Sequence, residues 1–358
     1  MKHKHALIII LTIALVILQG TTVFALETNT DNGQPPNTSE TQEPSSEMPA
    51  ENGEETPAPK PVKKPAKVKG LTVFSQKGFV RLTWKAAKRA ETYRVYRKYE
   101  GKRFKLIKET KKLTFKDKEV KTDRWVTYHV RAVRSGNDGK PVFGKYSARK
   151  KVFAVKTDPK KKMIALTFDD GPGPYTDRLL NALRKKKARA TFFVCGYRIG
   201  TYGKNLKKAY DIGCEIGNHT YDHPQLTNLT YSEIKSQISR TDKLIKKRIG
   251  VNAALMRPPY GSVDSTVRKA VGKPLILWSV DTKDWSTLDA QATIDSVLSS
   301  AEDGDIILMH DIHSSTVDAA VRLIPILQKR GFQLVTVSEM ARYKGVNLKN
   351  GRSYYRIG

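Results

Sequence analysis

Two separate segments of the chain supply side chains that could hold a metal ion. Asp169 and Asp170 directly follow an apolar run, Met163–Phe168. His219 and His223 stand four positions apart further along, so both rings would project from one face of a helical turn. Two imidazoles and one carboxylate can grip the same divalent ion. The sequence therefore predicts a metal site, with one of the two carboxylates left over.

The elements that position these groups can also be predicted. The apolar run before the aspartates is typical of a buried β-strand, which would deliver charge to the carboxyl end of a sheet, where α/β folds keep their chemistry. Further polar groups follow in Arg257–Gly261, Asp281–Trp285 and Leu308–His310. Together these groups suit amide hydrolysis, which needs an activated water, a base, stabilisation of the oxyanion and an acid for the leaving amine.

The ligand set favours a catalytic metal over a structural one. Asp170, His219 and His223 would leave positions open for water and an acyl oxygen. Zinc suits these ligands best, and Co²⁺ or another divalent ion is the alternative. Asp311 and His313 lie in one later loop, so a second ligand set there is conceivable.

Two other chemistries use similar groups. Non-haem iron oxygenases also have two histidines and a carboxylate, but that interpretation leaves Asp169, Arg257 and His310 unexplained. Glycoside hydrolases use paired carboxylates, but adjacent aspartates should point to opposite sides of a strand. Hydrolysis therefore ranks first.

The five segments, in this order, resemble the motifs of the NodB-homology polysaccharide deacetylases, carbohydrate esterase family 4. The resemblance covers residues 161–342. It implies a distorted (β/α) barrel and metal-dependent removal of N- or O-acetyl groups from sugars.

The same resemblance implies a role for individual residues. Asp169 would be the general base, and Arg257 would be the cation that keeps it ionised and aimed. The backbone N–H of Tyr260 would donate to the oxyanion. His310 would be the acid, with Asp284 as its orienting carboxylate. The apolar pocket for the acetyl methyl would be shaped by Trp285 and Leu308.

The amino terminus is typical of a secreted protein. Residues 1–25 combine a basic start, an apolar stretch and a small-residue cleavage site, which predicts a signal peptide. An uncleaved membrane anchor is the alternative. Residues 26–67 lack hydrophobic periodicity and predict a disordered linker rich in Pro, Glu, Thr and Lys.

Residues 68–156 change to short alternating runs that predict an all-β sandwich. These runs include Leu71–Val73, Val80–Trp84, Tyr93–Tyr96 and Tyr128–Val133. With Trp84 in an early core strand and Tyr128 in a later one, the segment resembles a fibronectin type III domain. The deacetylase domain is expected over residues 157–345, followed by a basic tail over residues 346–358.

The charge of the chain limits its partners. Of 358 residues, 65 are Lys or Arg and 35 are Asp or Glu, which gives a formal net charge of +30. Such basicity can indicate binding to nucleic acid, but a secreted protein would meet other polyanions instead. Besides the polysaccharide substrate, the candidate partners are teichoic acids and other anionic wall polymers, bound through the basic sandwich, and anionic lipid surfaces. A surface that only keeps the protein soluble is an equal alternative.

Cys195 and Cys214 are the only cysteines. Cys195 ends one predicted strand and Cys214 begins the next, so the two are out of register for a disulfide. We expect free, buried thiols.

Taken together, these features predict a secreted or wall-associated metal-dependent deacetylase. N-acetylglucosamine of peptidoglycan is the first substrate expected, with chitooligosaccharides and acetyl xylan as alternatives. A non-catalytic wall-binding protein is the alternative of another class.

Overall fold

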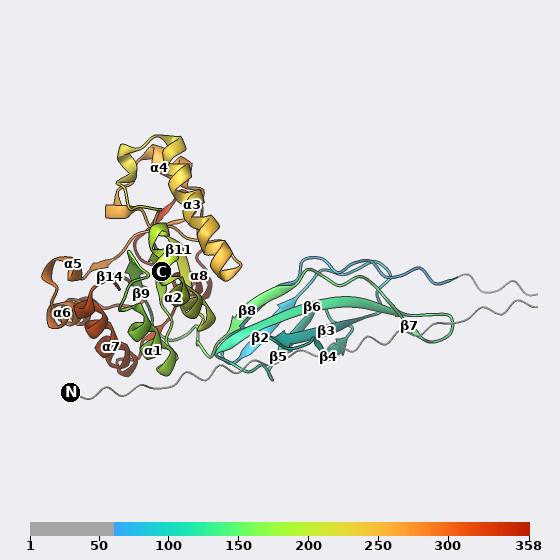
Figure 1. The fold of residues 1–358 in the computed structure, drawn as a ribbon. Helices are drawn as coiled ribbons and strands as arrows, with labels where there is room; N and C mark the ends of the chain where they lie inside the picture. Colours follow the sequence, from blue (N-terminus) through green and yellow to red (C-terminus); the bar gives the residue numbers. More distant parts are fainter. Residues whose placement is uncertain (1–60) are drawn as a thin grey trace, which may run out of the picture. The chain divides into compact units, whose positions relative to one another are not determined.

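The computed structural model describes residues 61–358, and Figure 1 shows its fold. The predicted signal peptide, and the predicted linker up to residue 60, lie outside the described residues. Within residues 61–358, no helix is both long and apolar enough to cross a membrane.

Residues 68–156, called here the strand region, form two antiparallel sheets. One sheet has the order β1-β2-β5, and the other has the order β4-β3-β6-β7 with β8 also paired to β6. The strands are β1 (Thr72–Gln76), β2 (Phe79–Thr83), β3 (Thr92–Tyr99), β4 (Lys105–Thr110), β5 (Thr114–Asp117), β6 (Arg124–Ser135), β7 (Pro141–Phe143) and β8 (Lys150–Ala154).

Alternation along the strands builds the core between the two sheets. Val80 and Leu82 of β2 are buried together with Val95 of β3 and Tyr128 of β6. The Tyr128 hydroxyl donates to the buried Asp117 of β5, at 2.7 Å, so a polar bond also ties the sheets together. The structure places strands on all four of the runs named from the sequence.

Two predicted boundaries need correction. The N–H of Ala66 donates to the carbonyl of Lys88 at 2.9 Å, so the last residues of the predicted linker are already attached to the strand region. Residues 346–358, predicted as a tail, include β16 (Ser353–Tyr354), which pairs with β12 (Leu275–Ile276). The buried Ile357 shows that this segment belongs to the core of the α/β region.

The α/β region is built around a parallel sheet. Its other strands are β9 (Met163–Asp169), β10 (Thr191–Val194), β11 (Glu215–Asn218), β13 (Val280–Asp281), β14 (Ile306–His310) and β15 (Gln333–Leu334). Its helices are α1 (Thr176–Lys185), α2 (Ile199–Asp211), α3 (Tyr231–Ile249), α4 (Ser265–Val271), α5 (Asp284–Thr287), α6 (Ala290–Ser300), α7 (Ser314–Lys329) and α8 (Val337–Tyr343).

The sheet bends back on itself. Its main path runs β11-β10-β9-β14-β13, and bridges through Met256 link β11 to β12. β12 and β13 are neighbours in the chain and stand at the two ends of this path. The arrangement is consistent with the predicted distorted (β/α) barrel.

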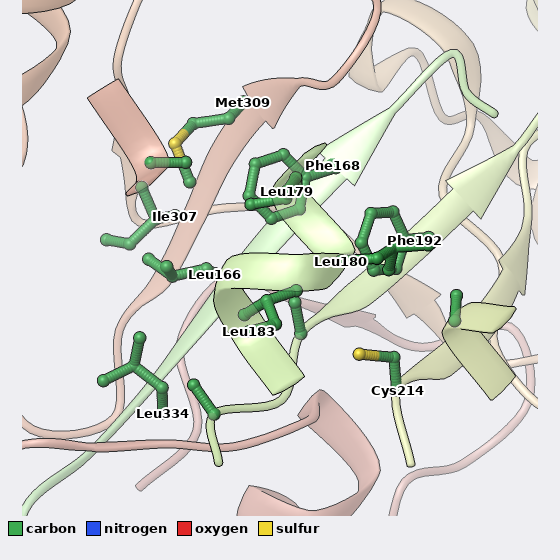
Figure 2. Packing of buried hydrophobic residues seen from close by; sticks show 14 of the residues in the cluster. Leu166, Phe168, Leu179, Leu180, Leu183, Phe192, Cys214, Ile307, Met309 and Leu334 are labelled. Carbon is green, nitrogen blue, oxygen red and sulfur yellow. The ribbon is translucent and has the colours of Figure 1, made fainter. Parts of the chain in front are cut away.

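Helix packing fixes the central strand. Figure 2 shows Leu179, Leu180 and Leu183 of α1 beside Phe168 of β9 and Phe192 of β10. All five side chains are buried in one cluster. Burial of each stabilises the fold by about 1.5–3 kcal/mol. β9 therefore has a fixed position, and so do the two aspartates at its end.

The strand region contacts the α/β region through Trp125 of β6. Its Nε1–H donates to the carbonyl of Tyr210 in α2 at 2.9 Å, and the two rings stack with centroids 4.7 Å apart.

Candidate active site

The carboxyl ends of neighbouring strands bring the predicted residues together. Asp169 ends β9 and His310 ends β14, and the two are partners in the parallel ladder. His219 follows β11 directly, two strands away on the other side of β9. Because parallel strands end at one edge of a sheet, residues distant in sequence meet there.

Asp170, His219 and His223 form a compact group of metal-ligand atoms. Asp170 Oδ1 lies 3.4 Å from His219 Nε2 and 3.2 Å from His223 Nε2. The three ligand atoms lie within 4.8 Å of one another, and no other such group occurs within residues 61–358. This group is the predicted ligand set.

The hydrogen bonds of His219 test whether a cation fits. Its Nδ1 lies 2.6 Å from the backbone carbonyl of Arg257, which can only accept, so Nδ1 carries a proton. Nε2 then faces Asp170, where a proton or a metal ion can lie between the ring nitrogen and the carboxylate oxygen. A second partner that fixes the tautomer is typical of metal-binding histidines.

The ionisation of the group agrees with this fit. Burial opposes the charge on Asp170, but the neighbouring imidazoles of His219 and His223 hold the pKa of Asp170 well below its usual value. Burial likewise opposes protonation of His219, yet the carboxylates of Asp169 and Asp170 raise the pKa of His219. Burial and the neighbouring His219 lower the pKa of His223. The carboxylates thus make a negative potential that would attract a cation.

The backbone that presents the ligands corrects the helical expectation. His219 and His223 lie in a loop, not on a helical turn, and Thr220 and His223 have positive φ values of 68° and 62°. Each such residue costs about 1–3 kcal/mol of strain. The loop is held by side chains: the N–H of Thr220 donates to Asn218 at 2.8 Å, and the N–H of His223 donates to Thr220 Oγ1 at 3.1 Å.

The expectation that Asp169 and Asp170 point to opposite sides was also wrong. Asp170 leaves the strand with a φ of 66°, and both carboxylates line the same cleft. Asp169 Oδ2 lies only 3.8 Å from His219 Nε2. The argument from alternation against a glycoside hydrolase therefore fails, because alternation stops at the end of β9.

A buried arginine orients Asp169. Arg257 is fully buried, and its Nη1 donates to Asp169 Oδ1 at 2.8 Å. Nη1 also donates to Thr167 Oγ1, while Nε and Nη2 donate to the carbonyls of Ile276 and Leu277. With its donors engaged, the guanidinium fixes one carboxylate oxygen and leaves the other facing the cleft.

A second pair joins His310 and Asp284. His310 Nδ1 lies 2.9 Å from Asp284 Oδ1, and the N–H of His310 donates to Asp284 Oδ2 at 2.7 Å. Thr316 Oγ1 donates to the same oxygen. Burial disfavours the imidazolium, but the bond to Asp284 outweighs burial and raises the pKa of His310 to about 9. His310 is therefore a proton donor near neutral pH.

These groups surround a cleft of about 380 Å³. Trp285, half exposed, and the buried Leu308 line it, as does Tyr260, which has a φ of 61°. Arg257 and Asp284 stand behind the residues that they orient and do not line it. Three lining residues were not predicted as site residues: Pro258, Trp278 and Asp281. Pro258 and Asp281 belong to segments already singled out, whereas no pattern marked Trp278.

The possible second ligand set at Asp311 and His313 does not form. Asp311 is buried and accepts a hydrogen bond from Thr176 Oγ1. It lies under Gly171, where an added Cβ would stand 2.3 Å from Asp311 Oδ1, so only glycine fits. Asp311 thus packs against the turn that follows Asp170.

The cysteine prediction is confirmed. Cys195 and Cys214 are both free and buried. In the ladder, Val194 is the partner of Asn218 and Thr191 is the partner of Glu215, which keeps the two thiols out of register.

The fold and the cleft define a hydrolase-type site at the carboxyl edge of the parallel sheet of an α/β fold. The polysaccharide deacetylase family matches residues 156–273. A Bacillus cereus peptidoglycan-N-acetylglucosamine deacetylase is 38% identical over 193 residues, which are 51% of this chain and 90% of that protein. The chain belongs to the polysaccharide deacetylase family, as the motifs predicted.

Two further relatives extend the likeness. The peptidoglycan-N-acetylmuramic acid deacetylase PdaC of Bacillus subtilis is 43% identical over 188 residues, which are 52% of this chain. The match spans only 40% of that protein's length. A solved structure described as T48 deacetylase with substrate is 43% identical with a TM-score of 0.54, covering 55% of this chain and 99% of that one.

Proposed function

We propose that this chain is a metal-dependent polysaccharide deacetylase that hydrolyses N-acetyl groups of cell-wall sugars, above all N-acetylglucosamine of peptidoglycan. One observation carries the proposal: the Asp170, His219 and His223 ligand group shares a cleft with Asp169 and His310. The complete set of groups argues against the alternative of a non-catalytic wall-binding protein.

The chain's residues divide the chemistry between them. A divalent ion, with zinc the best match, would polarise the acetyl carbonyl and lower the pKa of a water. Asp169 takes the proton of the attacking water, and the hydrogen bond from Arg257 holds the Asp169 carboxylate in position. The N–H of Tyr260 donates to the oxyanion. His310 gives its proton to the leaving nitrogen, and Asp284 keeps that proton available.

The relatives and the cleft support this substrate class. One relative is named for N-acetylglucosamine and another for N-acetylmuramic acid, and both names specify peptidoglycan. Trp285 and Leu308 offer an apolar wall for the acetyl methyl. Chitooligosaccharides and acetyl xylan remain the alternative substrates.

We also propose that the strand region is a fibronectin type III-like sandwich and that residues 1–25 direct the chain out of the cytoplasm. Amino-terminal sequencing of the secreted or wall fraction checks the second point: a start near Leu26 supports it, and an intact Met1 on membrane-held protein favours the anchor.

Acetate release tests the proposed function. The zinc-loaded chain is incubated with purified peptidoglycan, a chitooligosaccharide or acetyl xylan, and the sugars are analysed for free amines. We expect acetate from peptidoglycan and free amines on glucosamine units. Faster release from either other polymer would reassign the substrate, and release from none would reject the function.

A further inference from the structure

The outer face of the sheet β4-β3-β6-β7 carries a cluster of aromatic and cationic side chains. In the ladder, Tyr96 of β3 is the partner of His129 of β6, and Arg94 is the partner of Arg131. Val95, between Arg94 and Tyr96, points into the core. Alternation therefore sends the other four side chains to the face that the core does not use.

Three rings are stacked on this face. His129 lies 3.9 Å from Phe104 and 4.1 Å from Tyr146 between ring centroids, with interplanar angles of 14° and 10°. Two rings cannot occupy the same face of an imidazole at these distances, so His129 lies between them. Tyr96 meets His129 edge-on at 5.2 Å. The cluster is thus a fixed platform and not a set of loose side chains.

Cations surround the stack. The guanidinium of Arg131 lies 3.7 Å from the Phe143 ring centroid, and its Nε donates to the Tyr96 hydroxyl at 3.2 Å. Lys98 and Arg149 lie 5.2 Å and 5.6 Å from the Phe104 ring. An aromatic ring carries no net charge, so it holds a cation without neutralising it. A carboxylate would neutralise the cation. The face therefore keeps a positive potential.

The wider charge of the strand region adds to this potential. Residues 68–156 contain 27 lysines and arginines against seven aspartates and glutamates. On the face itself, Glu109 binds Arg94 at 2.7 Å. His129 adds no charge, since burial and then Arg149, Arg131 and Lys98 lower its pKa to about 4.

We propose that this outer face binds a polymer of sugar or polyol units joined by phosphodiesters. Such a polymer carries a negative charge at each repeat, which matches a dense array of cations. The fork of an arginine also fits a phosphate. The substrate is a poorer match, because each deacetylation exposes an amine that becomes a cation. A phosphodiester polymer keeps its charge while the enzyme works beside it.

The rings decide against a nucleic acid. Single strands bind where free aromatic faces accept the bases. Here one face of Phe104 and one face of Tyr146 are stacked on His129. Tyr146, 40% exposed, is the most exposed ring of the stack. Lys98 and Arg149 also lie over the Phe104 ring, and Arg131 lies over the Tyr146 ring, so cations compete with bases for these ring faces.

The test compares two double variants of the full chain. Lys98→Gln with Arg149→Gln removes two cations from the outer face. The control is Arg81→Gln with Lys116→Gln. These two exposed residues are neighbours across β2 and β5 of the other sheet, so the control also removes two cations. Fluorescence anisotropy measures binding of a short labelled poly(glycerol phosphate) at physiological salt. We expect Kd to rise about tenfold in the first variant and less than about twofold in the control.

Thermal melting confirms that both variants fold like the parent chain. Equal weakening in both variants would mean diffuse charge attraction and would overturn the proposal. The proposal would also be overturned if single-stranded DNA bound the parent chain as tightly as the phosphate polymer and lost as much affinity in the first variant. Absence of binding of the polymer to the parent chain would overturn it too. Acetate release from a soluble acetylated oligosaccharide, measured in parallel, reports the proposed function separately, because none of the four residues lies in the cleft.

Discussion

Histidines in the two regions of this protein have opposite surroundings. His310 in the α/β region lies against the Asp284 carboxylate, which raises its pKa to about 9 against the effect of burial. In the strand region, burial and three neighbouring cations lower the pKa of His129 to about 4. The surroundings of His310 therefore favour the protonated imidazole, and those of His129 favour the neutral one. The neighbours of a histidine, more than its presence, decide what it can do.

The arginines show the same contrast. Arg257 is fully buried and pairs with the Asp169 carboxylate, so its charge is used inside the fold. Arg131 lies on aromatic rings, so its charge remains available outside. The cleft is thus suited to a cation and to proton transfer, and the outer face of the strand region is suited to an anion.

The largest effect is expected from removing a ligand of the cleft. His219→Ala or His223→Ala should abolish tight metal binding and lower deacetylation by roughly three orders of magnitude or more, because each ring is one of three protein ligands. Metal content after dialysis and acetate release are measured together. His313→Ala is the matched control and should keep both. Full metal occupancy in both ligand variants would reject this site.

Asp169→Asn separates metal binding from proton transfer in the cleft. The variant should keep the metal but lose about two to four orders of magnitude in turnover, since the base is gone. It also leaves Arg257 buried without its carboxylate, which should cost roughly 3–5 kcal/mol of unfolding free energy. Asp295→Asn, at an exposed position of α6 outside the cleft, is the control. Near-normal turnover in Asp169→Asn would assign the base elsewhere.

The pair of His310 and Asp284 predicts a pH effect. Asp284→Asn removes the partner that raises the pKa of His310, so the alkaline limb of kcat/KM should move to lower pH. His310→Ala should flatten that limb and lower turnover without emptying the metal site. Profiles on one acetylated oligosaccharide decide this. An unmoved limb in Asp284→Asn would mean that another group is the acid, with His313 the next to test.

The same pair should be visible in stability. A raised histidine pKa stabilises the fold fully below the ordinary value near 6.5, and the contribution is lost as pH rises through about 9. Asp284→Asn should remove this dependence. Urea unfolding across that pH window checks the sign, and an unchanged pH dependence in the variant would contradict it.

The smallest effect is expected from removing the strand region. A chain that starts near Lys156 retains every residue of the cleft and should release acetate from a soluble oligosaccharide within about twofold of the full chain, as an independent domain would. It exposes the Tyr210 ring that Trp125 covers, so its melting temperature is measured alongside. A folded but inactive truncation would show that the strand region helps to build the site.

Much of the candidate site could be predicted from the sequence because short segments carry the relevant residue types. The apolar run of β9 marked the edge of the sheet, and residue types marked Asp170, His219 and His223. The backbone was not predictable in this way. Asp170 is left-handed beside Gly171, which packs against the distant Asp311. The left-handed His223 lies in a loop held by the side chains of Asn218 and Thr220. Spacing therefore predicted that Asp170, His219 and His223 lie together, as they do, but it predicted the wrong local structure.

Contacts between distant segments explain what the sequence could not show. Trp278 enters the cleft from the connection between two short strands, where no periodicity is visible. The stack of Phe104, His129 and Tyr146 likewise joins β6 to two separate loops. Only the pairing of strands makes such residues neighbours.

Metal reconstitution tests the central claim most directly. The chain is stripped with a chelator and titrated with zinc, while acetate release from peptidoglycan is followed at each step. We predict that activity returns in proportion to bound zinc and reaches its plateau at one ion per chain, and that His219→Ala regains none. Full activity in the stripped chain, or equal recovery in His219→Ala, would contradict a deacetylase built on Asp170, His219 and His223.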